Sequence, residues 1–198
     1  LGYNIDINNA ALLERLKICR ESRDGRNEKI IQKLQEQGIQ ITMEDIRPAD
    51  PNETIASPHI AKQLLKKKYV SSVKEAFDKY LAEGRSCYVE RIMPTPQEAI
   101  SLIQNSGGIA VLAHLMYYKK LNAEQKAELT AELKEAGLAG IETYYNTYTP
   151  VEEEYVKSLA KQHALHLTGG TDFHGQNKPH ISLFKGQGEM DIPEDILP

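Results

Sequence analysis

The chain has 198 residues, a length suited to one domain or two small ones, and its 40% hydrophobic content can fill a core. Its formal charge of −4 gives no overall attraction for nucleic acid or an anionic membrane, so phosphate binding requires a local cluster. No segment is typical of a membrane span or a signal peptide, and we expect a cytoplasmic protein. Cys19 and Cys87 are too far apart for a C-x-x-C pair and are expected to be core thiols.

The first half of the chain is predicted to be helical. Asn8 and Asn9 can cap a long helix that Gly38 would end. In chain order, the pattern predicts a helix at 10–37, a short helical start at 42–46, a loop at 48–58, helices at 59–68 and 73–82, and an irregular or strand-like segment at 84–94. The lysines at 66–68 form a charge run typical of a solvated face, so no DNA-binding patch is expected.

From Thr95 the pattern changes to alternating helices and strands. Thr95, Pro96 and Glu98 supply a cap residue, a proline in the first turn and a capping-box glutamate. The predicted elements are a helix ending at 105–107, a strand to 114, a helix at 122–136, a strand at 141–145, a helix at 149–163 and a strand at 163–167. Short joins that carry glycine favour a parallel α/β layer, followed by a less regular tail.

Residues 168–175, with the sequence TGGTDFHG, follow the last predicted strand. If the chain is still extended there, Asp172 and His174 point to the same side. The flanking glycines Gly169, Gly170 and Gly175 let the backbone turn beside the pair. An Asp-x-His at the end of a strand fits a divalent-metal site in an α/β enzyme, and an ordinary polar turn is the alternative.

A second strand-like segment, GGIAVLAH at residues 107–114, ends in His114. A lone His after a buried strand is more often structural than a ligand. Here two such segments end in side chains that can bind metal, and sites in parallel α/β sheets form at the carboxyl ends of strands. The shared placement therefore favours a metal site.

Three segments in order, GGIAVLAH, GIETYY and LTGGTDFHG, resemble the C-terminal half of a PHP-domain (polymerase and histidinol phosphatase) phosphoesterase. The similar subgroup acts on nucleoside 3′,5′-bisphosphates and RNA 5′ ends. The resemblance continues upstream through SPHIAKQLL, YVSSVKEAFDKYL and TPQEAISLIQNSGG. It implies an α/β fold: the C-terminal half of a distorted, TIM-like β/α barrel with an all-helical insertion domain. Residues 1–9 would end a barrel strand, 10–90 would form the insertion, and 91–198 would form the half-barrel.

The resemblance also implies two or three divalent metal ions (Mn, Zn or Fe) in the full-length site, with His114, Asp172 and His174 among the ligands. The family's other ligands precede the matched region. We therefore expect a C-terminal fragment that carries part of the active site and is inactive alone. Two residues depart from the family pattern: Leu115 stands where the family has Pro, and Ser57 where it has an Arg that contacts phosphate.

The first predicted helix carries Arg26 in the middle of an otherwise apolar face. A buried Arg needs an anion, so this face could line a phosphate cleft, or acids on the same helix could neutralise it. The family's insertion helix often carries a similar Arg-Asn pair, which favours the cleft. His59 begins a helix, where backbone N–H groups favour anions, and the resemblance implies a phosphate contact. A helix-start residue without special role is the alternative.

Two further features leave alternatives open. Glu142 could accept a hydrogen bond from a metal-bound His, or it could form a salt bridge at a sheet edge. The tyrosine pairs at 117–118 and 144–145 could line a base-stacking pocket.

Two functions compete on this evidence. The first is metal-dependent hydrolysis of nucleotide phosphates, with a small nucleotide or an RNA 5′ end as substrate, hydroxide supplied by metal-bound water, and no membrane partner. The second is a metal-free PHP-like module that binds a nucleotide or a protein without catalysis.

Overall fold

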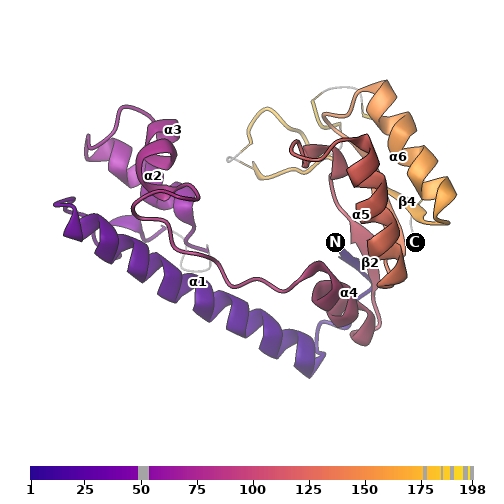
Figure 1. Cartoon of the computed structure of the whole chain (residues 1–198), viewed down its shortest axis with the longest axis horizontal. Coiled ribbons are helices and arrows are strands. Elements are labelled where there is room, and N and C mark those ends of the chain that lie inside the picture. Colours follow the sequence, from indigo (N-terminus) through magenta and orange to yellow (C-terminus); the bar gives the residue numbers. More distant parts are fainter. Residues whose placement is uncertain (49–53, 176–177, 184, 188–189, 194–195, 197–198) are drawn as a thin grey trace. The chain divides into compact units, whose positions relative to one another are not determined.

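The computed structural model describes residues 1–48, 54–175, 178–183, 185–187, 190–193 and 196. The chain divides into two compact units, one made of Leu1–Leu12 with Pro94–Pro198 and the other of Leu13–Met93 (Figure 1). Among the described residues, no helix combines the length and apolarity needed to cross a membrane.

The first unit is mixed α/β and contains a four-stranded sheet in the order β1-β2-β3-β4. β1 pairs antiparallel with β2, whereas β2, β3 and β4 are parallel. Its elements are β1 (Gly2–Tyr3), α4 (Pro96–Asn105), β2 (Ile109–Leu112), η3 (Leu115–Tyr117), α5 (Ala123–Glu135), β3 (Gly140–Tyr145), α6 (Pro150–Gln162) and β4 (His166–Gly170). The predicted alternation of helix and parallel strand is confirmed.

Capping boxes fix the starts of all three long helices in this unit. Thr95, Asn122 and Thr149 each accept a hydrogen bond from the backbone N–H three residues later, and Glu98, Gln125 and Glu152 return one. The cap predicted at Thr95 is confirmed. Such a cap stabilises a helix by about 1 kcal/mol, so the helix starts are set by local sequence.

The helices of this unit pack on one face of the sheet. Ile100 of α4, Ile141 of β3 and Val156 of α6 are buried in the same cluster, together with Ala110, Leu133 and Leu165. Because strand residues alternate, Glu142 and Thr168, which pair across β3 and β4, point to the opposite face.

A β-bulge in β3 determines which side chains of this strand lie on the face of the sheet opposite the helices. Glu142 pairs with Thr168 but Tyr144 pairs with Gly169, so Thr143 is an extra residue. The extra residue puts Glu142 and Tyr145 on the same face, although they are three positions apart. A side chain at position 170 would come 3.0 Å from Glu142 Oε1, so glycine gives the carboxylate room.

β4 differs from the strand predicted at 163–167. His163 caps the end of α6 and Ala164 has φ of 47°, which lengthens the helix connection. β4 therefore begins at His166 and includes Gly169 and Gly170. These two glycines do not make the predicted turn; Gly169 instead allows close packing, since a Cβ there would lie 2.8 Å from Tyr144 Cβ.

The second unit is helical. Its elements are α1 (Ala10–Glu36, which starts in the first unit), η1 (Glu44–Ile46), α2 (Ser57–Lys66), α3 (Val73–Ala76) and the π-helical turn η2 (Phe77–Leu81). Asn9 Oδ1 accepts a hydrogen bond from Leu12 N at 3.0 Å, and Gly38, with φ of 79°, follows the end of α1. Both predicted ends of the long helix are confirmed.

The core of the helical unit joins α1 to α2. Ile30 and Leu34 of α1 are fully buried with Ile60 and Leu64 of α2. Each such side chain stabilises the fold by about 2 kcal/mol relative to exposure. The apolar face predicted for α1 is buried at Leu12 and again from Ile30 onward, whereas Leu16 between them is exposed.

One expectation in this unit needs correction: Cys87 is buried as predicted, but Cys19 is only half-buried. Of the two alternatives predicted for residues 84–94, the irregular one is confirmed, since 84–87 form turns and 88–94 have no regular structure. Side chains of α1 satisfy carbonyls in that segment, since Lys33 Nζ donates to Tyr88 O at 2.9 Å and Arg26 Nε donates to Val89 O at 2.7 Å. The β-prone residues thus bind a helix instead of another strand.

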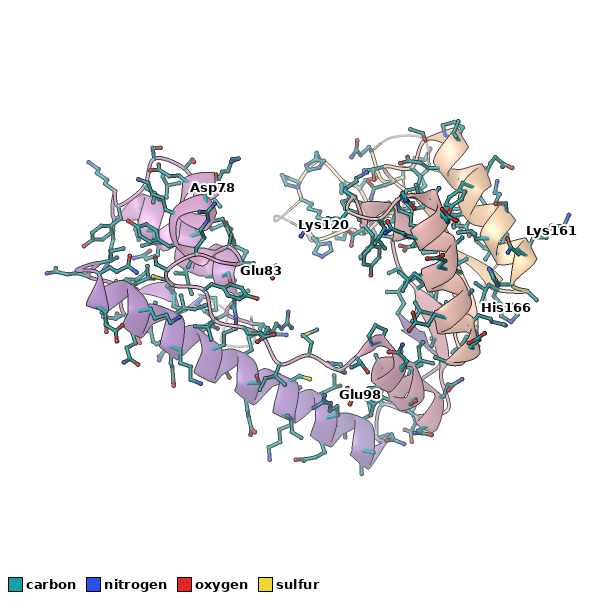
Figure 2. All side chains as sticks on the ribbon, viewed as in Figure 1. Asp78, Glu83, Glu98, Lys120, Lys161 and His166 are labelled. Atoms are coloured by element: carbon teal, nitrogen blue, oxygen red, sulfur yellow. The ribbon has the colours of Figure 1, made fainter. Side chains whose placement is uncertain are left out.

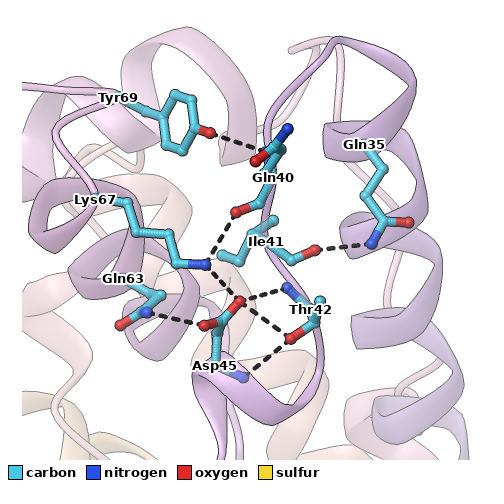
Figure 3. A network of polar contacts seen from close by, with 8 residues as sticks. All are labelled: Gln35, Gln40, Ile41, Thr42, Asp45, Gln63, Lys67 and Tyr69. Atoms are coloured by element: carbon cyan, nitrogen blue, oxygen red, sulfur yellow. Dashed lines mark hydrogen bonds and ion pairs between the residues drawn. The ribbon is translucent and has the colours of Figure 1, made fainter.

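Asp45 is the centre of a polar network that ties η1 to α2 (Figure 3). Asp45 Oδ2 accepts from Thr42 N at 2.8 Å and from Lys67 Nζ at 2.7 Å, and Thr42 Oγ1 accepts from Asp45 N at 3.3 Å. The short helical start predicted at 42–46 is confirmed. The hydrogen bond from Lys67, with those from Thr42, lowers the pKa of Asp45 below its usual value.

We expect Asp45→Asn to lower the melting temperature of the helical unit at neutral pH. The folded pKa of Asp45 is depressed, so its contribution is present above the unfolded pKa near 3.9 and is lost as pH falls through the folded value. Thermal unfolding of both proteins between pH 7 and pH 2 checks this. The curves should separate at pH 7 and converge at the acidic end; a difference that stays constant with pH would contradict the assignment.

Candidate metal centre

The candidate ligands lie at one edge of the sheet. His114 follows the last residue of β2 by two positions, and Asp172 follows the last residue of β4 by two. β2 and β4 both pair parallel with β3, so their carboxyl ends meet at the same edge. His114 and Asp172 therefore share an end of the sheet.

Both residues have left-handed backbone conformations, with φ of 35° at His114 and 52° at Asp172. Lys68 and Ala164 also have positive φ, but they follow the ends of α2 and α6, where that conformation is common. His114 and Asp172 follow strands, and each costs on the order of 1 kcal/mol of backbone strain. Strained residues cluster at functional sites, so their presence after β2 and β4, the two strands that flank β3, makes this edge a candidate site.

The turn at Asp172 corrects the expectation of extended backbone. Asp172 and His174 do not face one side through strand alternation. They meet because the chain turns: His174 Nδ1 lies 2.7 Å from the carbonyl oxygen of Asp172 and 3.4 Å from its Oδ1. Asp172 and His174 therefore lie close together because of this turn, and not because of the alternation of an extended strand.

This turn also fixes the tautomer of His174. A carbonyl oxygen only accepts, so Nδ1 carries the proton and donates it to Asp172 O. Nε2 then holds the lone pair. Histidines that bind metal commonly have this arrangement, with the other ring nitrogen donating to a carbonyl or carboxylate.

Asp172 Oδ2 is held from two sides. The hydroxyl of Tyr145, at the end of β3, donates to it at 2.8 Å, and Lys178 Nζ donates to the same oxygen. Burial by itself would raise the pKa of Asp172, but the hydrogen bonds from Lys178 and Tyr145 outweigh it and hold that pKa below its usual value. Asp172 is therefore a carboxylate at neutral pH.

Glu142 holds the backbone of His114. Its Oε2 accepts the N–H of His114 at 2.8 Å, and it lies on the central strand β3, so the alternative of an edge salt bridge is wrong. Burial raises the pKa of Glu142, and the charge of Asp172 adds to the rise. The contact is with the backbone and not with the imidazole, so Glu142 supports the left-handed turn and leaves the ring to other partners.

The ring of His114 is set by aromatic neighbours. It packs edge-on against Tyr117 at 5.8 Å and Tyr145 at 6.0 Å between ring centroids. Its Nδ1 is buried and has no hydrogen-bond partner among the described residues. Leaving such an atom unpaired costs about 1–3 kcal/mol, so this nitrogen fits a role as a ligand.

The donors at this edge suit a divalent metal ion in kind. They are a carboxylate, an imidazole Nε2 with its tautomer fixed, and a buried, unpaired imidazole Nδ1. In the part of the chain that the structure describes, no group of three or more His, Cys, Asp and Glu side chains is close enough to hold an ion. The predicted convergence of all three on one ion is therefore not formed in this arrangement.

A cavity of about 870 Å³ opens at the same end of the unit. Tyr144, Tyr145 and Asn146 line it from β3 and the turn that follows, and Lys185 and Gln187 line it from the tail. Tyr145 thus borders both the cavity and Asp172. The tyrosines proposed for base stacking differ in solvent exposure: Tyr145 is buried, whereas Tyr117 and Tyr118 are exposed.

The candidate phosphate residues lie in the helical unit. Arg26 donates from Nε to Val89 O and from Nη1 to Ser57 Oγ at 3.0 Å. None of the ion pairs formed by the described residues includes Arg26, so same-helix acids do not neutralise it in the described part. His59 Nδ1 accepts the backbone N–H of Ala56 at 3.0 Å and so caps α2. Sequence reasoning missed this structural role of His59.

Sequence reasoning also missed two partners of Asp172. Tyr145 ends β3, and its position at a strand end was a usable signal, although the bulge that aims it was not visible in the pattern. Lys178 lies six residues after Asp172 in a tail without periodicity, and no pattern pointed to it.

No protein-family model matches the chain. Among curated proteins, it is 33% identical over 183 residues to the 5′-3′ exoribonuclease Rnm of Escherichia coli, a match that covers 92% of this chain and 62% of that protein. It is 28% identical over 201 residues to the 3′,5′-nucleoside bisphosphate phosphatase of Chromobacterium violaceum, which covers the whole chain and 67% of that protein. The chain thus spans about two thirds of these relatives.

Solved structures give the same grouping. An amidohydrolase from Chromobacterium violaceum, with sulfate bound and no metal, is 28% identical with a TM-score of 0.73 over 87% of this chain and 61% of that one. A candidate metal-dependent phosphoesterase from Bifidobacterium adolescentis has the same fold, with a TM-score of 0.74 and 24% identity over 96% of this chain and 66% of that one. The chain is therefore a homologue of the exoribonuclease Rnm and of the nucleoside bisphosphate phosphatase. The resemblance carried by its motifs is confirmed.

We expect Tyr145→Phe to destabilise the α/β unit by about 1 kcal/mol at pH 7, because one hydrogen bond to the Asp172 carboxylate is lost. The folded pKa of Asp172 is depressed, so the loss should fade as pH falls through that pKa. Urea unfolding at several pH values measures it. Tyr118→Phe, at an exposed tyrosine, is the matched control; equal effects of the two variants would argue against the contact.

Proposed function

We propose that the protein is a metal-dependent phosphoester hydrolase that acts on nucleotide phosphates, either a nucleoside 3′,5′-bisphosphate or an RNA 5′ end. The main support is the Asp172–His174 turn, in which a carboxylate and a tautomer-fixed imidazole stand at the same sheet edge as the unpaired Nδ1 of His114. The names of the relatives support the substrate class: one is an exoribonuclease and another a nucleoside bisphosphate phosphatase.

The proposal includes an architecture. Residues 91–198, with 1–9 as the end of a strand, form the C-terminal half of a PHP barrel, and residues 10–90 form a helical insertion. The parallel pairing of β2, β3 and β4 with helices on one face supports a half-barrel. The helical unit at Leu13–Met93 supports the insertion.

His114, Asp172 and His174 would hold one or more divalent ions (Mn, Zn or Fe), together with the further ligands that the resemblance implies. Such an ion, when bound, lowers the pKa of a water molecule and neutralises charge on the phosphoryl oxygens. The residues of this chain prepare the site. Tyr145 holds the Asp172 carboxylate in place, and Glu142 holds the left-handed turn that carries His114.

Arg26 and His59 would bind the substrate phosphates. The guanidinium of Arg26 has five N–H donors, and its two internal hydrogen bonds leave further donors for an anion. Burial lowers the pKa of Arg26 but leaves it charged at neutral pH. The sulfate in the Chromobacterium structure supports an anion site in this fold.

One observation favours the non-catalytic alternative. Oδ2 of Asp172 is engaged by Tyr145 and Lys178, and the described candidate ligands do not close around an ion. A module that binds nucleotide or protein without metal would need no more than this. Metal analysis of the purified full-length protein, followed by phosphate release from nucleoside 3′,5′-bisphosphates and 5′-phosphorylated oligoribonucleotides, separates the two. Absence of both metal and turnover would favour the module.

We expect Asp172→Ala and His174→Ala in the full-length protein each to lower kcat/KM by more than about 100-fold, since losing a ligand should exceed the loss known for ligand-supporting groups. Both side chains follow a strand and lie outside the core, so both variants should fold. Asp172→Ala should have the lower melting temperature, because it also loses the contacts with Tyr145 and Lys178. Steady-state kinetics and thermal unfolding, with His166→Ala as an exposed histidine control, test this. Rates near wild type at saturating metal would refute the ligand assignment.

Arg26→Ala should raise KM more than it lowers kcat, if the phosphate contact is equally strong in ground and transition states. A loss of about tenfold in kcat/KM corresponds to one charge-assisted hydrogen bond. Because Arg26 also bonds Ser57, the variant Ser57→Ala separates the internal contact from the phosphate contact. An Arg26→Ala protein with unchanged KM but lower stability would show that Arg26 has only its structural role.

A further inference from the structure

Lys178 stands directly against the candidate ligand Asp172. Its Nζ donates to Asp172 Oδ2, the same oxygen that accepts from Tyr145. The side chains of Lys178 and Asp172 are 35% and 24% exposed, so the pair is partly withdrawn from water. The backbone N–H of Lys178 donates to Gly175 O at 3.1 Å, which anchors the lysine close to the Asp-x-His turn. The contact between Lys178 and Asp172 is therefore supported by the local backbone structure that follows the Asp-x-His turn.

We propose that Lys178 is an internal cation that competes with the metal ion for Asp172 and thereby sets how tightly the site binds metal. This inference rests on the proposed function. A carboxylate oxygen that accepts from an ammonium and a hydroxyl has little capacity left for a third strong partner. An ion that binds through Asp172 Oδ2 has to displace the ammonium.

Electrostatics make the competition strong. A divalent ion at Asp172 with Lys178 in its present place would put like charges within contact distance, where repulsion in a partly buried site is several times larger than in water. Lysine is suited to move away, because its ammonium sits on a flexible stem and rehydrates readily. The measured metal affinity is then lower than the affinity of the ligands alone, because part of the binding free energy is used to move Lys178 away from Asp172.

The other neighbours of Asp172 do not compete in this way. Tyr145 is neutral at physiological pH, because burial and the adjacent Asp172 raise its pKa further. Its hydroxyl can keep its hydrogen bond while the carboxylate binds an ion through a free lone pair. His174 contacts Asp172 through Nδ1 and leaves Nε2 for the ion. Lys178 is thus the partner whose charge opposes a metal.

The test is metal affinity, measured by calorimetric titration of Mn²⁺ and Zn²⁺ into the chelator-treated full-length protein. Lys178→Met removes the charge and keeps most of the side-chain volume, and Lys178→Gln is a second neutral variant. Lys178→Arg keeps the charge. Lys161→Met removes a charge from α6, where Figure 2 shows Lys161 on the outer side of the helix, and controls for net charge.

We expect both neutral variants to bind metal about tenfold more tightly than wild type, as the loss of one partly exposed ion pair and its repulsion predicts. Lys178→Arg should bind close to wild type, and so should Lys161→Met. Equal or weaker binding by Lys178→Met and Lys178→Gln would overturn the inference, because Lys178 would then be neutral or supportive for the site.

Asp172→Ala distinguishes this inference from the proposed function. If Asp172→Ala loses metal binding while the neutral Lys178 variants bind like wild type, only the role of Lys178 is wrong. If Asp172→Ala binds metal as tightly as wild type, Asp172 is not a ligand, and both the competition and the proposed function fail.

Discussion

The carboxylate of Asp172 is the contact on which the candidate site depends. It joins three parts of the α/β unit: β3 through Tyr145, its own turn through His174, and the tail through Lys178. Each contact is charge-assisted or close to a charge, so each is stronger than an ordinary neutral hydrogen bond. Without the carboxylate, the tyrosine hydroxyl would lose its acceptor and the lysine its counter-ion.

This arrangement requires the strands to end where they do. The bulge at Thr143 turns Tyr145 to the face that Glu142 already occupies, and Gly170 leaves room for the Glu142 carboxylate. Glu142 in turn holds the N–H of His114. A single extra residue in β3 therefore links the ends of β2 and β4, and the strained backbone at His114 and Asp172 is supported by contacts that cross the sheet.

The sequence was most informative where structure is set locally. The proline and cap residues at 95–98 predicted a helix start that the structure contains, because a cap needs only residues three positions apart. The strand that precedes Asp172 was placed three residues too early, because Ala164 adopts a left-handed turn that a single alanine does not signal. Bulges and turns of this kind depend on contacts between distant strands, which no local pattern carries.

The candidate site also has a part that the local sequence predicted and a part that it did not. The ligand types were predictable, since Asp-x-His and a strand-end His are local features, but their support was not. Glu142 and Lys178 act through contacts between residues 28 and 6 positions apart, and only the fold brings these together. The three ligands share a sheet edge in the described structure, and their role in binding metal stays a prediction.

The departure at Ser57 bears on the phosphate contact proposed for Arg26. The resemblance implies an Arg at this position, and two guanidiniums side by side repel each other unless an anion lies between them. In this chain Ser57 Oγ accepts a hydrogen bond from Arg26 at 3.0 Å. The substitution thus replaces a like charge by a neutral acceptor, and Arg26 is held by the protein before any phosphate arrives. A preorganised arginine loses less side-chain entropy on binding, which offsets part of the missing second charge.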